Sequence, residues 1–223
     1  MTGKITFTLD GKQVEAAPDE TIWQVAQRQG TEIPHLCYAP EPGYRADGNC
    51  RACMVEIKGE RVLAASCIRK PVQDMVVNTA SKEAKSARRM VMEMLVADQP
   101  ARETAPDPQS KFWAWADAMG VTDSRSPARA NTESDSSHVA IAVNLAACIH
   151  CNLCVRACRE VQVNDVIGMA HRGNAAKIVF DFDDPMGDST CVACGECVQA
   201  CPTGALMEAN LLDDAGTRRE FED

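Results

Sequence analysis

Eight cysteines in the C-terminal half of the chain form a repeated pattern that suits metal-cluster chemistry. The first run is Cys148-Ile-His-Cys151-Asn-Leu-Cys154-Val-Arg-Ala-Cys158, and the run from Cys191 to Cys201 repeats its C-x2-C-x2-C-x3-C spacing. Three thiolates in one short loop can hold three corners of an iron–sulfur cube, and a fourth cysteine one helical turn further on points away toward a second cube. The spacing therefore predicts two [4Fe–4S] clusters.

The same run occurs in bacterial two-cluster ferredoxins, where the fourth cysteine of each run ligates the other cluster. Pro202 follows the second run, as in those ferredoxins, whereas Arg159 takes the place of the proline after the first run and removes no ligand. Zinc would call for CxxC pairs, and a disulfide framework suits a small secreted domain, so both alternatives fit the doubled run less well. We expect one cluster to be held by Cys148, Cys151, Cys154 and Cys201, and the other by Cys191, Cys194, Cys197 and Cys158.

Four more cysteines lie in the N-terminal third, and they use up the twelve cysteines of the chain. They are Cys37, Cys50, Cys53 and Cys67. Plant-type [2Fe–2S] ferredoxins use C-x4-C-x2-C…C, and this chain keeps the inner CxxC and the distant fourth cysteine but lengthens the first gap. Gly43, Gly48 and two prolines in that gap suit a loop that folds over a cluster. We predict a [2Fe–2S] cluster here, with zinc as the alternative.

The composition of the chain limits its possible partners and its cellular compartment. The chain has 223 residues, a formal net charge of −9 and only 4% aromatic residues. The negative charge argues against a nucleic-acid partner. The N-terminus has no signal-peptide pattern, and there is no apolar run of ~18 residues that would predict a membrane span. Twelve cysteines in such a chain indicate a reducing cytoplasm and metal ligation.

The elements expected around the first cysteine group are those of a β-grasp ferredoxin domain. Residues 4–17 alternate in polarity about Asp10-Gly11, which predicts a hairpin. A helix over about Glu20–Gln29 is expected, with Asp19 as its N-cap and Gly30 as its stop. Further strands are predicted at Met54–Ile57, Arg61–Ala65 and Met75–Val77.

The rest of the chain predicts an α+β organisation in which helices connect two cluster domains. Helices are expected at Ser81–Ala97 and Ser110–Met119, and strands at Val139–Val143 and Lys177–Phe182. Residues 122–137 indicate a flexible connection. On the first helix, a solvated basic face is expected from Lys82, Lys85, Arg88 and Arg89. The predicted domains are a [2Fe–2S] domain at 1–79, a helical connector at 80–137, a two-cluster domain at 138–209 and a charged tail at 210–223.

This order of domains resembles a known family of redox subunits. The chain is similar to the N-terminal region of the alpha subunit of NAD-dependent, molybdenum- or tungsten-containing formate dehydrogenases. It also resembles the N-terminal part of the largest peripheral-arm subunit of respiratory complex I and the small diaphorase subunit of NAD-reducing hydrogenases. The resemblance covers nearly the whole chain, and it is carried by Gly48–Ile57, Val62–Lys70, Ala97–Pro100, Lys111–Trp113, Cys158–Asp165 and Phe180–Gly187.

Two departures from the family pattern stand out. Complex I-like relatives hold an extra cluster between the domains with one histidine and three cysteines, but this chain has no cysteine from 68 to 147. Alpha subunits of the family also continue into a pterin-binding catalytic domain, so this sequence is either a separate subunit or a fragment. Since it has neither GxGxxG nor a Walker A motif, no catalytic site is expected in it.

The resemblance implies an electron-transfer subunit of a cytoplasmic formate dehydrogenase complex. Its partners would be a molybdenum- or tungsten-pterin catalytic subunit and a flavin- and NAD-binding subunit. The alternatives are the small diaphorase subunit of an NAD-reducing hydrogenase and a free ferredoxin-like carrier or maturation scaffold. A succinate dehydrogenase-type subunit fits less well, because it uses the short first gap.

Overall fold

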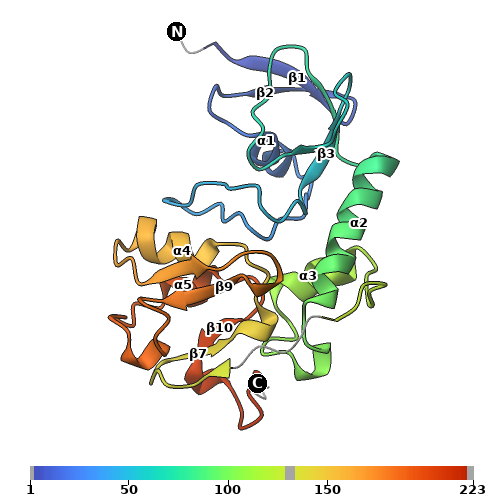
Figure 1. Cartoon of the computed structure of the whole chain (residues 1–223). Coiled ribbons are helices and arrows are strands. Elements are labelled where there is room, and N and C mark those ends of the chain that lie inside the picture. Colours follow the sequence, from blue (N-terminus) through green and yellow to red (C-terminus); the bar gives the residue numbers. More distant parts are fainter. Residues whose placement is uncertain (1–2, 129–133, 220–223) are drawn as a thin grey trace. The chain divides into compact units, whose positions relative to one another are not determined.

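The computed structural model describes residues 3–128 and 134–219, which form two compact units (Figure 1). The first unit comprises Met1–Tyr38 and Ala46–Met92, and the second comprises Ala39–Arg45 and Glu93–Asp223. Both mix helices with sheets, as the predicted α+β class requires. The predicted boundaries after residues 79, 137 and 209 remain a prediction.

The first unit is built on a five-stranded mixed sheet. Its strand order is β2-β1-β5-β3-β4, and β1 pairs parallel with β5 while the other neighbours are antiparallel. A parallel pair flanked by hairpins is the arrangement expected of a β-grasp domain. The strands are β1 (Ile5–Leu9), β2 (Lys12–Ala16), β3 (Met54–Ile57), β4 (Ala64–Ala65) and β5 (Val76–Asn78).

The first hairpin follows the predicted pattern. Leu9 pairs with Lys12 across a turn in which Asp10 and Gly11 both have positive φ, 49° and 81°. This is the backbone that two-residue hairpin turns need, and glycine adopts it without steric cost. Alternation then buries Phe7 and Leu9 on one face of the sheet.

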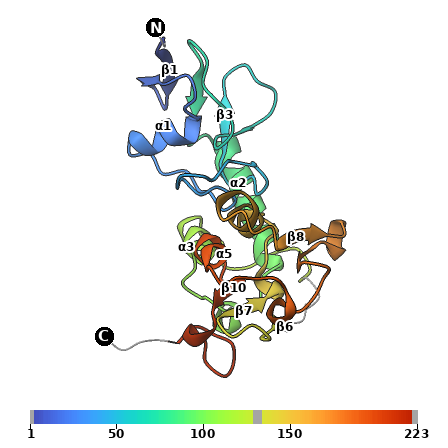
Figure 2. The ribbon, with the colours of Figure 1, turned by 90° about the vertical axis from the view of Figure 1, so that its left-hand side faces the viewer.

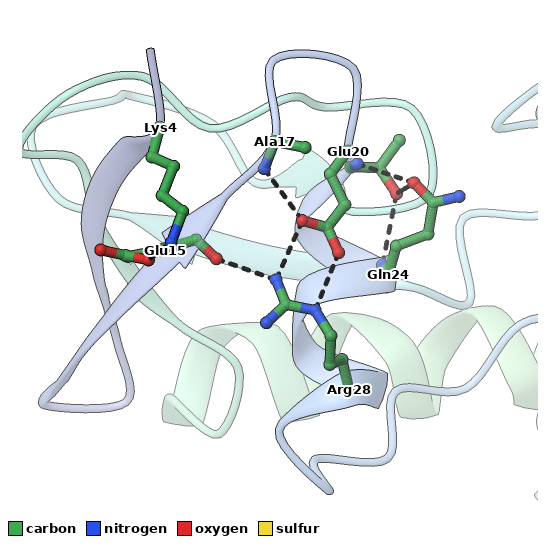
Figure 3. A network of polar contacts seen from close by, with 7 residues as sticks. Lys4, Glu15, Ala17, Glu20, Gln24 and Arg28 are labelled. Atoms are coloured by element: carbon green, nitrogen blue, oxygen red, sulfur yellow. Dashed lines mark hydrogen bonds and ion pairs between the residues drawn. The ribbon is translucent and has the colours of Figure 1, made fainter. Parts of the chain in front are cut away.

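The helix that packs on this sheet begins later than predicted. Helix α1 spans Ile22–Arg28, and its N-cap is Thr21 rather than Asp19. The Thr21 hydroxyl accepts from the Gln24 amide while the Gln24 side chain accepts from the Thr21 amide, a capping box shown in Figure 3. Asp19 instead pairs with Lys70 at 2.8 Å. Gly30, with φ of 76°, ends the helix as predicted.

On helix α2 (Lys82–Ala97), Lys82, Lys85 and Arg89 are exposed as predicted, but the prediction is wrong for Arg88. Arg88 is buried, and its Nη2 donates to the Thr79 carbonyl at 2.7 Å. Thr79 in turn donates twice to Asp10, from its amide and from its hydroxyl. Arg88 follows Ala84 by one helical turn, so it lies on the apolar stripe and not on the solvated side.

The second unit contains small sheets and short helices. Strands β7 (Ile141–Asn144) and β10 (Leu206–Glu208) lie side by side in Figure 2 and pair antiparallel, and β8 (Ile167–Ala170) pairs with β9 (Lys177–Phe180). Its helices are α3 (Lys111–Ala118), α4 (Leu153–Arg156) and α5 (Glu196–Ala200). The 3-10 turns are Arg102–Thr104, Leu145–Ala147, Gly173–Ala175, Met186–Asp188 and Ala209–Leu211, and Ala157–Val161 is a π-helical turn.

Residues 122–137, predicted to be a flexible connection, include a short strand. Residues 129–133 lie outside the described residues, but Ser134–Asp135 form a short strand, β6, that pairs with β7. The Asp135 carboxylate also accepts from the Met186 amide at 2.7 Å. The end of the connection is therefore part of the folded unit.

Candidate metal centres

The two ferredoxin-like runs fold into loops of matching backbone shape. The second and fourth residues after the first cysteine have positive φ in both runs: 53° and 61° at His150 and Asn152, 56° and 77° at Ala193 and Gly195. Three of these four residues carry a side chain, for which this conformation is unfavourable. The sequence repeat is therefore also a structural repeat, held in a strained shape by its surroundings.

Backbone amides in these loops point at sulfur. The His150 amide donates to Cys148 Sγ at 3.5 Å, and the Ala193 amide donates to Cys191 Sγ at 3.4 Å. The two contacts occupy the same position in each repeat. Hydrogen bonds of this kind favour the thiolate form that binds metal, and they influence cluster potentials.

The first expected ligand set surrounds a common cavity. Cys148, Cys151 and Cys154 line it together with Cys201 from the other run, and apolar side chains such as Ile178 close its wall. Burial raises the pKa of the Cys154 thiol, and the charges of Cys151, Cys148 and Cys201 raise it further. Several thiolates in one apolar cavity repel each other, so positive iron ions would offset a cost that the protein alone cannot.

The second expected set is also brought together. Burial, with the charges of Cys191, Cys194 and Cys158 and then that of Cys201, raises the pKa of Cys197 to about 12. The Cys158 sulfur accepts from the Val166 amide at 3.3 Å. Asn164 Nδ2 lies 3.8 Å from the sulfur of Cys194, the exposed member of the set. The segment after the first run thus supplies donors to sulfurs of the second set.

The four N-terminal cysteines are in mutual hydrogen-bond contact. Hydrogen bonds from Cys50 and Cys67 lower the pKa of Cys37, and the corresponding bonds raise the pKa of Cys50 and of Cys67. A hydrogen bond from Cys67 lowers the pKa of Cys53 to about 7. The Cys50 amide also donates to Cys37 Sγ at 3.4 Å. Four thiols linked by hydrogen bonds in a mostly buried space fit the predicted [2Fe–2S] site.

Two histidines of the chain, His35 and His138, contact protein groups. The His35 ring stacks edge-on against Trp23, and the indole Nε1 of Trp23 donates to the Ile33 carbonyl at 3.0 Å. His138 Nδ1 accepts from the amides of Ala140 and Ile141, which gives this histidine a structural role.

Sequence reasoning missed two charged residues beside the [4Fe–4S] loops. Arg156 is 2% exposed, and its Nη2 donates to the Cys151 carbonyl at 3.1 Å. Glu196 opens helix α5, and one of its oxygens accepts from Tyr44 Oη at 2.9 Å. The position of Arg156 between two predicted ligand cysteines could have indicated that it is buried. The contact of Tyr44 with Glu196 joins distant segments, so no local sequence pattern indicated it.

No helix in the described part of the chain is long and apolar enough to cross a membrane. No disulfide joins any of the twelve cysteines, all of which the structure describes. Within residues 3–128 and 134–219, no group of three or more His, Cys, Asp or Glu side chains is arranged so that it could hold a single metal ion.

Comparison with protein families identifies a domain in each of two segments of the chain. Residues 2–82 match the 2Fe-2S iron-sulfur cluster binding domain, and residues 147–205 match the 4Fe-4S dicluster domain. These matches confirm the predicted cofactor content of one [2Fe–2S] and two [4Fe–4S] clusters.

Whole-chain comparisons find similar redox proteins. The NADP-reducing hydrogenase subunit HndD of Solidesulfovibrio fructosivorans is 33% identical over 215 residues, which are 93% of this chain and 37% of that protein. A Staphylococcus aureus protein named "Putative formate dehydrogenase" is 27% identical over 225 residues, 100% of this chain and 22% of that protein. The chain thus spans well under half the length of these curated relatives.

A solved structure shows the same fold. A chain in the crystal structure of an NAD+-reducing [NiFe]-hydrogenase in the H2-reduced state superposes with a TM-score of 0.82 at 29% identity, covering 96% of this chain and 92% of that one. The chain therefore joins an N-terminal 2Fe-2S iron-sulfur cluster binding domain to a 4Fe-4S dicluster domain, and it is similar to hydrogenase and dehydrogenase proteins.

Proposed function

We propose that this chain is the iron–sulfur electron-transfer part of a cytoplasmic, NAD-dependent formate dehydrogenase. It would relay single electrons between a molybdenum- or tungsten-pterin formate site and a flavin- and NAD-binding subunit. The observation that carries this proposal is that all twelve cysteines gather into three groups, two of them in a dicluster domain. Similarity over the whole of this chain to the Staphylococcus aureus protein named "Putative formate dehydrogenase" supports the formate reaction.

The ligand assignment is part of the proposal. Cys37, Cys50, Cys53 and Cys67 would hold the [2Fe–2S] cluster. Cluster A denotes the [4Fe–4S] cluster of Cys148, Cys151, Cys154 and Cys201, and cluster B that of Cys191, Cys194, Cys197 and Cys158. The shared cavity of Cys201 with the first run supports the crossed arrangement for cluster A, and the charge neighbours of Cys197 support it for cluster B.

Iron–sulfur clusters, when bound, accept and release one electron at a time. The residues of this chain would hold those groups apart from water and set their potentials. Buried apolar side chains such as Ile178 and Leu206 exclude water from the cavity at cluster A. Amides such as those of His150 and Val166 place donors on the sulfurs, where they stabilise the more negative reduced state.

A second candidate function is the small diaphorase subunit of an NAD-reducing hydrogenase. The specific observation in its favour is the solved hydrogenase chain, which matches this chain over nearly the whole length of both. The same flavin-containing partner would then serve a nickel–iron site rather than a pterin site.

Purification of the native complex under anaerobic conditions separates these functions. Formate-dependent NAD reduction, together with bound molybdenum or tungsten, is the result that we expect. Hydrogen-dependent NAD reduction with bound nickel would support the diaphorase function. A monomer that never co-purifies with another redox subunit would instead identify a free carrier or scaffold and overturn both proposals.

A further inference from the structure

The two cysteine runs that form clusters A and B differ in charge. Position by position, Leu153 of the first run corresponds to Glu196 of the second, and Arg156 corresponds to Gln199. Arg156 and Glu196 are the only formally charged side chains within the two runs. One repeat therefore carries a cation and the other an anion, although their backbones match.

The Arg156 guanidinium is held against the loop of cluster A by hydrogen bonds. Its Nη2 donates to the Cys151 carbonyl at 3.1 Å, and its Nε donates to the Asn152 carbonyl at 3.2 Å. Its Nη1 donates to the carbonyl of Arg45. Because Arg156 is 2% exposed and an arginine stays protonated in proteins, its positive charge is held inside the unit.

The anion is fixed beside cluster B. Glu196 lies between Cys194 and Cys197, and both belong to the expected ligand set of cluster B. One carboxylate oxygen accepts from Tyr44 Oη at 2.9 Å and the other from Gln162 Nε2 at 3.2 Å. Tyr44 packs against the apolar core of the same unit, so the carboxylate is held in place rather than swinging in solvent.

We propose that Arg156 and Glu196 tune the two [4Fe–4S] clusters in opposite directions. A nearby cation stabilises a cluster that has gained an electron, so Arg156 raises the potential of cluster A. A nearby carboxylate disfavours the gain, so Glu196 lowers the potential of cluster B. The inference rests on the proposed function, because it requires that both clusters are present and take up electrons.

Anaerobic redox titration of the purified complex, followed by electron paramagnetic resonance, tests this inference. In Glu196→Gln, which keeps the hydrogen bond from Tyr44, we expect the midpoint potential of one [4Fe–4S] signal to rise. At a fixed potential, the oxidised-to-reduced ratio of that signal should fall about tenfold, which is about 59 mV for a one-electron couple. In Arg156→Gln, the potential of the other [4Fe–4S] signal should fall.

Two further variants keep the test decisive if Arg156→Gln folds poorly. Arg156→Lys keeps the positive charge, so the midpoint potential of cluster A should lie closer to that of the unaltered complex than in Arg156→Gln. A merely structural role of Arg156 would not explain that result. Gln199 corresponds to Arg156 in the second run and is exposed. Gln199→Glu adds a negative charge there, and it should shift the midpoint potential of the nearby [4Fe–4S] cluster less than Glu196→Gln does. The [2Fe–2S] signal should keep its midpoint in every variant.

The inference is overturned if iron and sulfide content are intact but neither variant shifts a midpoint, or if both variants shift the same signal. Loss of the [4Fe–4S] signals from the unaltered complex would instead overturn the proposed function itself. The two failures are therefore distinguishable in one set of samples.

Discussion

The cores of the two units differ in what fills them. In the first unit, cysteine contributes only Cys53 and Cys67 to a core of large apolar residues on the sheet, such as Phe7, Ile22 and Trp23. In the second unit, four buried cysteines belong to the core itself, and Cys191 and Cys201 pack against it. Cysteines are thus a small part of the first core, whereas four of the fifteen buried residues of the second core are predicted cluster ligands.

This difference shows two ways to stabilise a small domain. A sheet that buries a continuous apolar face is stable through burial of that face. The second unit has strands of only two to four residues, and its helices α3, α4 and α5 have eight, four and five residues, so we expect cluster binding to supply free energy that apolar burial does not.

Removal of iron should affect the units unequally. Anaerobic chelation of the full chain should abolish amide protection across residues 147–205, because the thiolates of that core would be left crowded without positive charge. The strands of the first unit should keep most of their protection. Hydrogen exchange read by mass spectrometry measures both in one sample, and equal loss in the two units would refute the contrast.

Loss of a single ligand should damage a cluster across the repeat. Cys158→Ser should remove the cluster held mainly by Cys191, Cys194 and Cys197, because serine is a poorer iron ligand. Cys201→Ser is the matched control and should damage the cluster held by Cys148, Cys151 and Cys154. Electron paramagnetic resonance of the two variants should show different missing signals, and loss of the cluster nearest in sequence would disprove the crossed assignment.

An apolar truncation in the sheet should destabilise only the first unit. Phe7 is fully buried, so Phe7→Ala should lower the free energy of unfolding of that unit by about 3–5 kcal/mol. Phe182, which is 95% exposed, provides the control, and Phe182→Ala should change stability by less than about 0.5 kcal/mol. Denaturant unfolding followed by circular dichroism and by cluster absorbance distinguishes the units, and unchanged sheet stability in Phe7→Ala would contradict the account.

The smallest effect should be a pH dependence near the start of the chain. Arg28 donates twice to Glu20, and this bonding lowers the pKa of the Glu20 carboxyl (Figure 3). Because the folded pKa lies below the unfolded one, the contribution is complete at neutral pH and is lost as pH falls through the lowered value. Unfolding of Glu20→Gln should therefore vary less with pH below the ordinary glutamate pKa.

Glu15→Gln is the control for that measurement. Glu15 pairs with Lys4 at 2.6 Å, but both side chains are more than half exposed, so water and salt screen the pair. Because this pair is exposed, Glu15→Gln should affect the measured stability less than Glu20→Gln does. A larger effect of Glu15→Gln than of Glu20→Gln on stability would contradict the role proposed for the Glu20–Arg28 pair.

Local sequence signals predicted much of this molecule. Asp10-Gly11, Gly30 and the strand at Met54–Ile57 appear where expected, because turn geometry and alternation act over a few residues. The helix start was wrong because Asp19 and Thr21 are both good capping residues. Gln24, three residues after Thr21, was the overlooked sign of a capping box.

Residues whose environment depends on distant segments were harder to predict. Arg88 looked solvated because arginine usually is, yet it shares a helix face with Ala84. The contact of Tyr44 with Glu196 joins residues 152 positions apart, and no local pattern encodes it. The grouping of the cysteines into ligand sets stays a prediction, which rests on the spacing that a cluster of fixed size imposes on its ligands.

The most direct test of the account is the metal content of the full chain, prepared without oxygen. Iron and acid-labile sulfide should each be present at about ten per chain, two plus four plus four. Zinc in place of iron, or cystine bridges among the twelve cysteines of a freshly isolated sample, would contradict the claim that these sulfurs carry electrons through three clusters.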